Sequence, residues 1–415
     1  MKKCCVMIAL ALVYAFALAG CAGSMLSGAP SLPAEETSAG TADVDAGTPV
    51  EENLGFTVIP ASVEEPEEEP PQEPEETDPA ADKIEQLLGD MTLEERVAQM
   101  FFVGCPSSGA AEVLSQYALG GYILFASNLS GLTADDVRTM LDGFQERAEI
   151  PLLIGVDEEG GTVVRVSSNP NLRDARFLSP RDLYAEGGME RVVEDAHEKS
   201  QLLLSLGINV NLAPVCDVTA GESDFMYARS FSGDAEAVSE YVSRVVEVMC
   251  EENIGSVLKH FPGYGSCADT HVGMVVDHRA ADDFYVSDFL PFTAGVQSGG
   301  RAVMVCHNIA EAFDAEMPAS LSPAVHEILR ETLGGDVVVL TDDLDMDGIT
   351  DYTDGASAAV QAVMAGNDML LTSDYAVQIH AVLNAVQNGT IPEERINESV
   401  RRILAWKISL GLIAV

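Results

Sequence analysis

The sequence predicts an α/β fold: a single (β/α)₈ TIM-like barrel preceded by a signal peptide and a disordered acidic linker. From residue 81 to residue 415, eight short apolar runs alternate with amphipathic, helix-like stretches. The runs are apolar throughout, as expected for parallel strands that are buried on both faces. Eight strand–helix units in this length favour a closed barrel. The open, doubly wound sheet is the alternative, but the Gly-x-Gly-x-x-Gly and Gly-Lys-Ser/Thr phosphate-binding motifs are missing from every strand–helix junction.

Residues 1–20 have the pattern of a secretory signal peptide. Lys2 and Lys3 precede an apolar run that ends at Ala19. A membrane-spanning helix is the alternative, but the run is short for that purpose and no basic cluster follows it. Leu18-Ala19-Gly20-Cys21 resembles the lipobox of bacterial lipoproteins. We therefore expect Cys21 to be acylated and to anchor an extracytoplasmic protein to the cell membrane.

Residues 21–80 have the composition of a disordered, Pro/Glu-rich linker. The segment from residue 22 onward contains no Lys or Arg, and residues 64–78 form an acidic, proline-rich run. Such a segment buries too little apolar surface to fold, and charge repulsion keeps it extended. An acidic tail that binds a partner is the alternative to a solvated tether. The folded domain is therefore expected at residues 81–415.

Composition excludes several classes of function. The chain has 415 residues, 47% of them hydrophobic, which is ample for a large core. A formal net charge of −45 disfavours binding to nucleic acid by charge. The eight cysteines lack the close spacing of a zinc site or a disulfide scaffold, and the five beyond Cys21 cannot all pair within the chain. We expect no metal site and no nucleic-acid partner.

Each predicted strand is a short apolar or β-branched run, and each predicted helix has a periodicity near 3.6 residues. The strands are residues 100–103, 122–125, 152–156, 209–212, 256–258, 302–305, 337–340 and 369–371. The helices are residues 92–99, 135–148, 188–206, 235–252, 287–297, 322–332, 355–365 and 376–388, with a closing helix at 397–410.

Polar side chains follow five of the eight predicted strands, whereas almost none follow the first two. In a barrel of this kind the chemistry is confined to the carboxyl ends of the strands. Charged side chains from five strands would therefore converge on one rim and form a pocket for a polar, multi-hydroxyl ligand. The candidates, in chain order, are Asp157, Arg165, Arg229, Lys259, His260, Asp269, His271, His307 and Asp342.

Several of these residues also have a structural explanation. Asp157 could cap the next helix, and Arg165 and Arg229 could be surface arginines. His307 could be a core histidine that bonds a backbone carbonyl. Asp342 is the aspartate nearest the seventh strand, so it is the one expected to point inward.

The candidate set fits a displacement at a sugar carbon. A carboxylate at a strand end, Asp342, would attack C1, and a second group would protonate the leaving oxygen and then activate water. His271 is the candidate for the second group. Asp269, two residues before it, would accept a hydrogen bond from the imidazole, orient it and stabilise its charged form.

Taken together, the motifs resemble family 3 glycoside hydrolases of the single-barrel β-N-acetylhexosaminidase type. The matching segments run in the family's order through almost all of residues 84–412. They are residues 121–125, 155–161, 211–218, 229–231, 259–265, 269–271, 303–307, 341–346 and 365–369. The chain ends with the closing helix, so the second domain of two-domain β-glucosidases is not expected.

The resemblance implies a retaining hydrolase of terminal β-linked N-acetylglucosamine, with no metal or organic cofactor. Asp342 would be the nucleophile and His271 the general acid/base supported by Asp269. The terminal sugar would contact Asp157, Arg165, Arg229, Lys259 and His260, with His307 nearby. The expected substrates are N-acetylglucosamine-containing glycans or muropeptides derived from peptidoglycan, and the protein is expected to be a monomer.

Four departures from the family pattern concern loops. Thr162 replaces the usual Arg, Tyr264 replaces a second His, Ser232 replaces Gly, and the loop between Gly265 and Asp269 is one residue shorter. Two other functions stay open. A β-N-acetylglucosaminide phosphorylase is one, because a His does not repel phosphate as a carboxylate would. The other is a non-catalytic lipoprotein that binds muropeptides or sugars.

Overall fold

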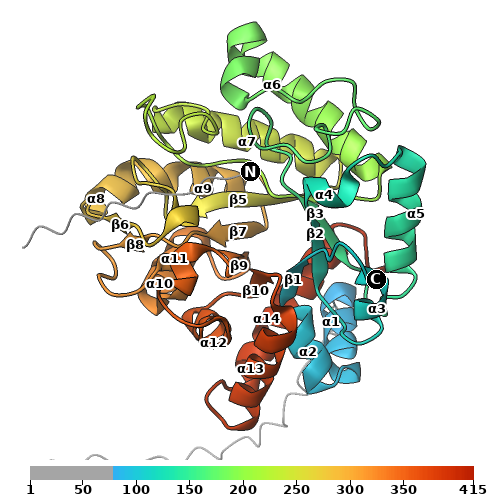
Figure 1. Ribbon diagram of the computed structural model, residues 1–415. Coiled ribbons are helices and arrows are strands. Elements are labelled where there is room, and N and C mark those ends of the chain that lie inside the picture. Colours follow the sequence, from blue (N-terminus) through green and yellow to red (C-terminus); the bar gives the residue numbers. More distant parts are fainter. Residues whose placement is uncertain (1–77) are drawn as a thin grey trace, which may run out of the picture. The chain divides into compact units, whose positions relative to one another are not determined.

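Eight parallel strands form a closed barrel in the computed structural model, which describes residues 78–415 (Figure 1). Around the barrel the strands are β1 (Phe101–Gly104), β2 (Gly121–Leu124), β3 (Leu153–Val156), β4 (Val210–Asn211), β5 (Gly255–Phe261), β7 (Ala302–Val305), β9 (Val338–Asp343) and β10 (Met369–Thr372), which pairs again with β1. The predicted TIM-like barrel is confirmed. The predicted signal peptide, Cys21 and the predicted linker up to residue 77 lie outside the described residues.

All eight predicted strands are present, and their boundaries shift by a few residues. The largest differences are at β5 and β9, which continue to Phe261 and Asp343 although their apolar runs end at residues 258 and 340. The sequence pattern stops at the first polar side chain. In the structure these polar residues stay in the strand because ion pairs and hydrogen bonds satisfy them, as described below.

Helices surround the barrel, as Figure 1 shows. They are α1 (Pro79–Asp90), α2 (Leu93–Gln99), α3 (Ala110–Leu114), α4 (Ala126–Leu129), α5 (Ala134–Gln145), α6 (Pro180–Ser205), α7 (Ala235–Glu251), α8 (Ala281–Asp283), α9 (Phe289–Gln297), α10 (Pro323–Leu333), α11 (Asp347–Thr350), α12 (Gly355–Ala365), α13 (Tyr375–Gln387) and α14 (Glu393–Ser409). Short turns η1 (Thr270–Val272), η2 (Phe284–Asp288) and η3 (Ala319–Leu321) connect some of them. No helix in this part of the chain is long and apolar enough to cross a membrane.

Side-chain caps fix where the helices begin. Thr92 and Glu95 form a reciprocal capping box at α2, and Thr133 and Asp136 do the same at α5. α6 starts eight residues before its predicted start at Gly188, because Ser179 caps an extra segment that begins with a proline. The helix is interrupted at residues 187 and 188, and the predicted start at Gly188 falls at this interruption.

Several elements were not predicted from the sequence, among them the short helices α3, α4, α8 and α11, the helix α1 and a small second sheet. α1 begins at Pro79, where Asp78 accepts a hydrogen bond from Ala80 N, so the folded part starts slightly before residue 81. A two-stranded parallel sheet, β6 (Val276–Asp277) with β8 (Ile309–Ala310), lies outside the barrel.

The barrel interior is packed with side chains, and one glycine makes room for a ring. A Cβ atom on Gly155 of β3 would lie 2.6 Å from Phe102 Cζ and 2.9 Å from Leu212 Cδ1. Phe102 is fully buried and fills this space between β1 and β3. The tight packing closes the barrel below its carboxyl rim, so that a ligand can enter only at the rim.

Asp368, just before β10, joins two outer helices to the barrel. Its carboxylate accepts from Arg330 of α10 at 2.7 Å and from Ser399 and Arg402 of α14 at 2.7 and 3.1 Å. It also accepts from the backbone N–H of Val339. Burial would raise the pKa of Asp368, but the surrounding arginines hold it below its ordinary value.

We predict that Asp368→Ala lowers the free energy of unfolding by about 3 kcal/mol, because it removes a fully buried carboxylate and leaves three partly buried arginines without their shared partner. Urea unfolding at neutral pH measures this. Glu247→Ala, which removes the exposed ion pair with Arg244, is the control and is expected to change the value by less than about 0.5 kcal/mol. The contribution of Asp368 is present above the ordinary aspartate pKa and is lost as the pH falls below it. Equal effects of the two substitutions would contradict the prediction.

Candidate active site

A cavity of about 320 Å³ lies at the carboxyl ends of the strands. Seven of the nine predicted site residues line it: Asp157, Arg165, Arg229, Lys259, His260, His271 and Asp342. Apolar residues, among them Phe125 and Met346, complete the lining together with Tyr264 and Asp343. The structure therefore brings together residues that are far apart in the sequence. Asp269 and His307 lie outside the lining.

Four charged side chains form a network on one wall of the cavity. Lys259 Nζ lies 2.6 Å from Asp157 Oδ1 and 2.7 Å from Glu159 Oε1. Arg229 donates through Nε and Nη2 to the two oxygens of Glu159, at 2.9 and 2.7 Å. Burial would raise the pKa of Glu159, but the Arg229 and Lys259 charges hold it well below its usual range. The network is therefore ionised and rigid.

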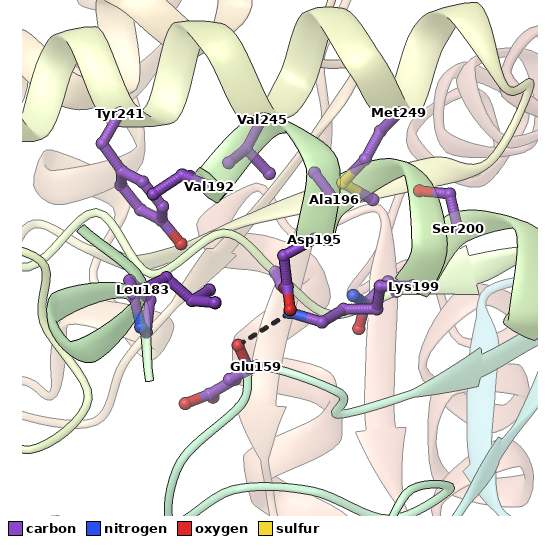
Figure 2. Close-up of a pocket in the computed structure, with 13 residues that line it drawn as sticks. Glu159, Leu183, Val192, Asp195, Ala196, Lys199, Ser200, Tyr241, Val245 and Met249 are labelled. Carbon is purple, nitrogen blue, oxygen red and sulfur yellow. Dashed lines mark hydrogen bonds and ion pairs between the residues drawn. The ribbon is translucent and has the colours of Figure 1, made fainter. Parts of the chain in front are cut away.

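Glu159 is a residue that the sequence analysis did not select. From outside the barrel, Lys199 of α6 donates to its backbone carbonyl at 3.1 Å and pairs with Asp195 (Figure 2). Figure 2 also shows side chains of α6 and α7, including Tyr241, around a cavity of about 20 Å³, which has room for about one water molecule. Glu159 is thus held from both sides. Its place directly after β3 was the signal that could have identified it.

Glu158 fixes the loop that carries Arg165. Its carboxylate, fully buried, accepts from the backbone N–H groups of Arg165 and Val166 at 2.8 and 2.7 Å. It also accepts from Ser167 N at 3.2 Å. The Arg165 side chain reaches the cavity and lies 3.7 Å from Asp157. This arrangement supports the inward position of Arg165 over the alternative of a surface arginine.

Asp217 sets the orientation and the tautomer of His260. One carboxylate oxygen accepts from His260 Nδ1 at 2.8 Å, and the other accepts from Tyr264 N at 2.8 Å. His260 Nε2 lies 3.2 Å from Arg229 Nη2. Since a guanidinium can only donate, Nε2 is the acceptor and the imidazole is neutral with its proton on Nδ1. Asp217 is buried and was not given a role by the sequence analysis.

Asp342 and Asp343, the last residues of β9, face the cavity with different charge states. Burial would raise the pKa of Asp342, but the partial positive charges on the rings of His307 and His260, together with the hydrogen bond that Asp343 N donates to its carboxylate at 2.9 Å, hold it below its ordinary value. Burial raises the pKa of Asp343 to about 7. Near neutral pH the site therefore holds one ionised carboxylate, Asp342, beside one carboxyl that is partly protonated. An ionised carboxylate in a cavity can act as a nucleophile.

Asp269 and His271 form a pair beside the cavity. Asp269 Oδ1 accepts from His271 Nδ1 at 2.7 Å and from the His271 backbone N–H at 2.9 Å. This bond leaves His271 Nε2 free to donate or accept a proton. The two side chains are 30% and 58% exposed, so a ligand or water can reach the imidazole. The predicted pairing is present in the structure.

His307 lies behind the strand end instead of in the cavity lining. Its Nε2 donates to the backbone carbonyl of Asp343 at 2.9 Å, and its Nδ1 lies 2.7 Å from Ser320 Oγ. Burial lowers the pKa of His307, which favours the neutral ring. With both ring nitrogens occupied, His307 matches the alternative of a core histidine bonded to a backbone carbonyl. It can support Asp343 but has no free nitrogen for a ligand.

Metal ligation requires a cluster of suitable side chains, and the described residues, 78–415, contain no group of three or more His, Cys, Asp and Glu that could hold an ion. The geometry instead combines an ionised carboxylate, an exposed Asp–His pair and a wall of ion-paired hydrogen-bonding groups. This combination can carry out nucleophilic displacement with proton transfer.

Comparison with known proteins gives the family. The model of the glycosyl hydrolase family 3 N-terminal domain matches residues 92–406, which is more than half of the chain. The chain belongs to glycosyl hydrolase family 3. It is therefore a glycoside hydrolase, and the expectation drawn from its motifs is confirmed at this level.

Individual relatives are about 30% identical to the chain over the residues that align with it. A beta-hexosaminidase of Hydrogenovibrio crunogenus is 30% identical to it, and the alignment covers 66% of this chain and 77% of that relative. Beta-hexosaminidase LpqI of Mycobacterium tuberculosis is 29% identical, and the alignment covers 75% of this chain and 82% of that relative. The solved family 3 beta-N-acetylglucosaminidase from Paenibacillus sp. is 32% identical with a TM-score of 0.73, covering 78% of this chain, which spans 64% of that structure's chain.

We predict that Asp343 makes the stability of this family 3 domain fall as the pH rises from about 4 to about 7. The pKa of Asp343 is raised on folding, so in this range the folded state binds more protons than the unfolded state, and unfolding becomes easier as the pH rises. The free energy of unfolding of Asp343→Asn, relative to that of the parent, should therefore rise by about 3 kcal/mol between pH 4 and pH 7. Denaturant unfolding of both proteins at several pH values measures the difference. A difference that does not change with pH would contradict it.

Proposed function

We propose that the protein hydrolyses terminal β-linked N-acetylglucosamine with retention of configuration. The observation that carries the proposal is that Asp342 and His271 line the same cavity as the ion-paired wall of Asp157, Lys259 and Arg229. A nucleophile, a proton carrier and a set of sugar-binding groups are thus available to one ligand. The printed names of the relatives, beta-hexosaminidases and a beta-N-acetylglucosaminidase, support the choice of sugar.

The first step forms a glycosyl ester. The Asp342 carboxylate attacks C1 of the sugar as the bond from C1 to the leaving oxygen breaks. His271, protonated on Nε2 and bonded through Nδ1 to Asp269, gives its proton to that oxygen. The low pKa of Asp342 keeps the nucleophile ionised.

The second step releases the sugar. His271, now neutral, takes a proton from a water molecule, and the water oxygen attacks C1 from the face that the leaving group vacated. The ester bond to Asp342 breaks and the carboxylate is restored. Asp269 stabilises the imidazolium whenever it forms. Two displacements at C1 give retention.

The ion-paired wall is suited to hold the sugar hydroxyls. Asp157 supplies acceptor oxygens, and Arg165 and Arg229 supply N–H donors in fixed directions. Lys259 holds Asp157 in place, and His260 is fixed by Asp217. Because these groups are already paired with one another, little reorganisation is needed when the sugar binds.

The natural substrate that we propose is an N-acetylglucosamine-containing peptidoglycan fragment. The sequence signals of a lipoprotein support this, because a chain anchored outside the cytoplasm through Cys21 would face the cell wall. Only the terminal sugar would be bound deeply, and the remainder of the fragment would extend past His271 toward solvent.

We expect Asp342→Asn to reduce release of the chromophore from an aryl β-N-acetylglucosaminide by about 1,000-fold or more, because the amide is a poor nucleophile. Asp347→Asn, an exposed aspartate five positions later, is the matched control and should keep parent activity. Trapping with a fluorinated N-acetylglucosaminide should place the adduct on Asp342. An adduct elsewhere, or a parent that binds the sugar tightly without turnover, would overturn the proposal, the latter in favour of a non-catalytic binder.

A phosphorylase is the second candidate, and the histidine proton carrier favours it. A carboxylate in the place of His271 would repel phosphate in the second step, whereas the imidazole does not. Incubation with and without phosphate distinguishes the two functions. A sugar 1-phosphate formed at the expense of free sugar identifies the phosphorylase, and free sugar in both reactions identifies the hydrolase.

The proposed anchor at Cys21 makes a separate prediction. In a bacterial host, the parent should take up labelled palmitate and sediment with membranes. Cys21→Ser should lose the label, since no thiol remains at the lipobox cysteine. Cys5→Ser, which changes a cysteine inside the apolar run, is the matched control and should keep the label. Label that persists in Cys21→Ser would show that the anchor is elsewhere.

A further inference from the structure

The loop at residues 266–274 carries the Asp269–His271 pair, and one residue between the two faces inward. Thr270 is fully buried, while the side chains on either side are 30% and 58% exposed. The turn η1 thus presents the proton-carrying pair to solvent and the cavity, and presents Thr270 to the protein. The position of Thr270 therefore determines where His271 can lie.

The Thr270 hydroxyl forms a hydrogen bond with one other side chain. Tyr264 Oη lies 2.5 Å from Thr270 Oγ1, and the Tyr264 side chain is itself buried. Within the part of the chain that the structure describes, this is the one hydrogen bond that joins residues 268–274 to residues outside the loop. Loss of the tyrosine hydroxyl would leave Thr270 Oγ1 buried without that partner, which is unfavourable.

Tyr264 is held by the groups that hold the sugar-binding wall. Its backbone N–H donates to Asp217, whose other oxygen accepts from His260. The Tyr264 ring packs edge-on against the His260 ring, with centroids 5.3 Å apart and an interplanar angle of 82°. Phe225 packs against its other side at 5.7 Å. The phenol therefore has a fixed direction relative to His260.

The two ends of the loop are fastened independently of Tyr264. Arg279 donates to the carbonyl of Gly263 at 3.1 Å and pairs with Asp277 and Asp288. Gly265, at φ +53°, lies against this guanidinium: a Cβ atom there would be 2.6 Å from Arg279 Cζ. Removing the tyrosine hydroxyl leaves these contacts in place, so it should release only the middle of the loop.

We propose that Tyr264 is a positioning residue that holds the Asp269–His271 pair over the cavity through Thr270. The inference rests on the proposed hydrolysis for its kinetic consequence. Tyr264 also lines the cavity, but its hydroxyl is bonded to Thr270, so this role requires no contact between that hydroxyl and the sugar or the leaving group. It links the fixed position of His260 and Asp217 to the turn that carries the proposed proton carrier. The helix α11 also packs against this turn, but within the described residues it contributes no hydrogen bond to residues 268–274.

The test compares two aryl β-N-acetylglucosaminides, of phenol and of dinitrophenol. Phenol leaves only with a proton, whereas dinitrophenol leaves without help, so general acid catalysis contributes to the first reaction alone. Tyr264→Phe should lower kcat/KM for the phenyl substrate by about 10-fold or more and change it less than about twofold for the dinitrophenyl substrate. Tyr122→Phe is the matched control, since it removes the hydroxyl of another buried tyrosine, bonded to Ala110 O at 2.8 Å. The control should leave both values unchanged.

Thr270→Val removes the same hydrogen bond from the other side, so it should give the same selective loss, and the double variant should lose no more than either single variant. In both single variants, the amides of residues 268–274 should exchange hydrogen faster than in the parent, whether or not either substrate is turned over. Equal losses on the two substrates, or unchanged exchange, would overturn the inference. A parent that exchanges as expected but hydrolyses neither substrate would instead overturn the proposed function.

Discussion

The buried ion pair between Lys259 and Glu159 is the interaction on which the candidate site depends. Both side chains are 2% exposed, so neither charge is stabilised by bulk water. Removing two charges from water is costly, and such pairs are often no more stable than apolar residues of the same size. Arg229 and Asp157 extend the pair to four charges, and Lys199 supports Glu159 from behind. The arrangement is thus better explained by a rigid surface for a polar ligand than by stability.

Much of the fold was predictable from the sequence, because buried parallel strands give continuous apolar runs. The runs ended too early at β5 and β9, where the pattern changes at Lys259 and Thr341 although the backbone continues in the strand. Local periodicity cannot show that a partner far along the chain, such as Asp157, will satisfy a charge within a strand. The part of α6 after Gly188 was predicted, whereas the capped segment before it was not.

The sequence predicted the site residues that are polar and follow a strand. It did not predict the residues that hold them in place. Polar residues at strand ends identified the lining, and seven of them meet in one cavity. His307 carried the same signal but lies behind the strand, because the sequence cannot say which way a ring turns. Glu159 and Asp217 are as central in the structure, yet their roles depend on which cations and imidazoles they face. Such partners become known only from the packed structure.

The continuous segment from β5 to β6 has two parts that are held in different ways. Its first part is a strand within the barrel, and its second part is a turn fastened at the base by Arg279 and at the middle by Thr270. Residues can be inserted or deleted between these two points of attachment without moving a strand. The reach of His271, the proposed proton carrier, can therefore evolve separately from the wall that we propose holds the sugar. Enzymes with this arrangement could diversify in their leaving groups while keeping the same terminal residue.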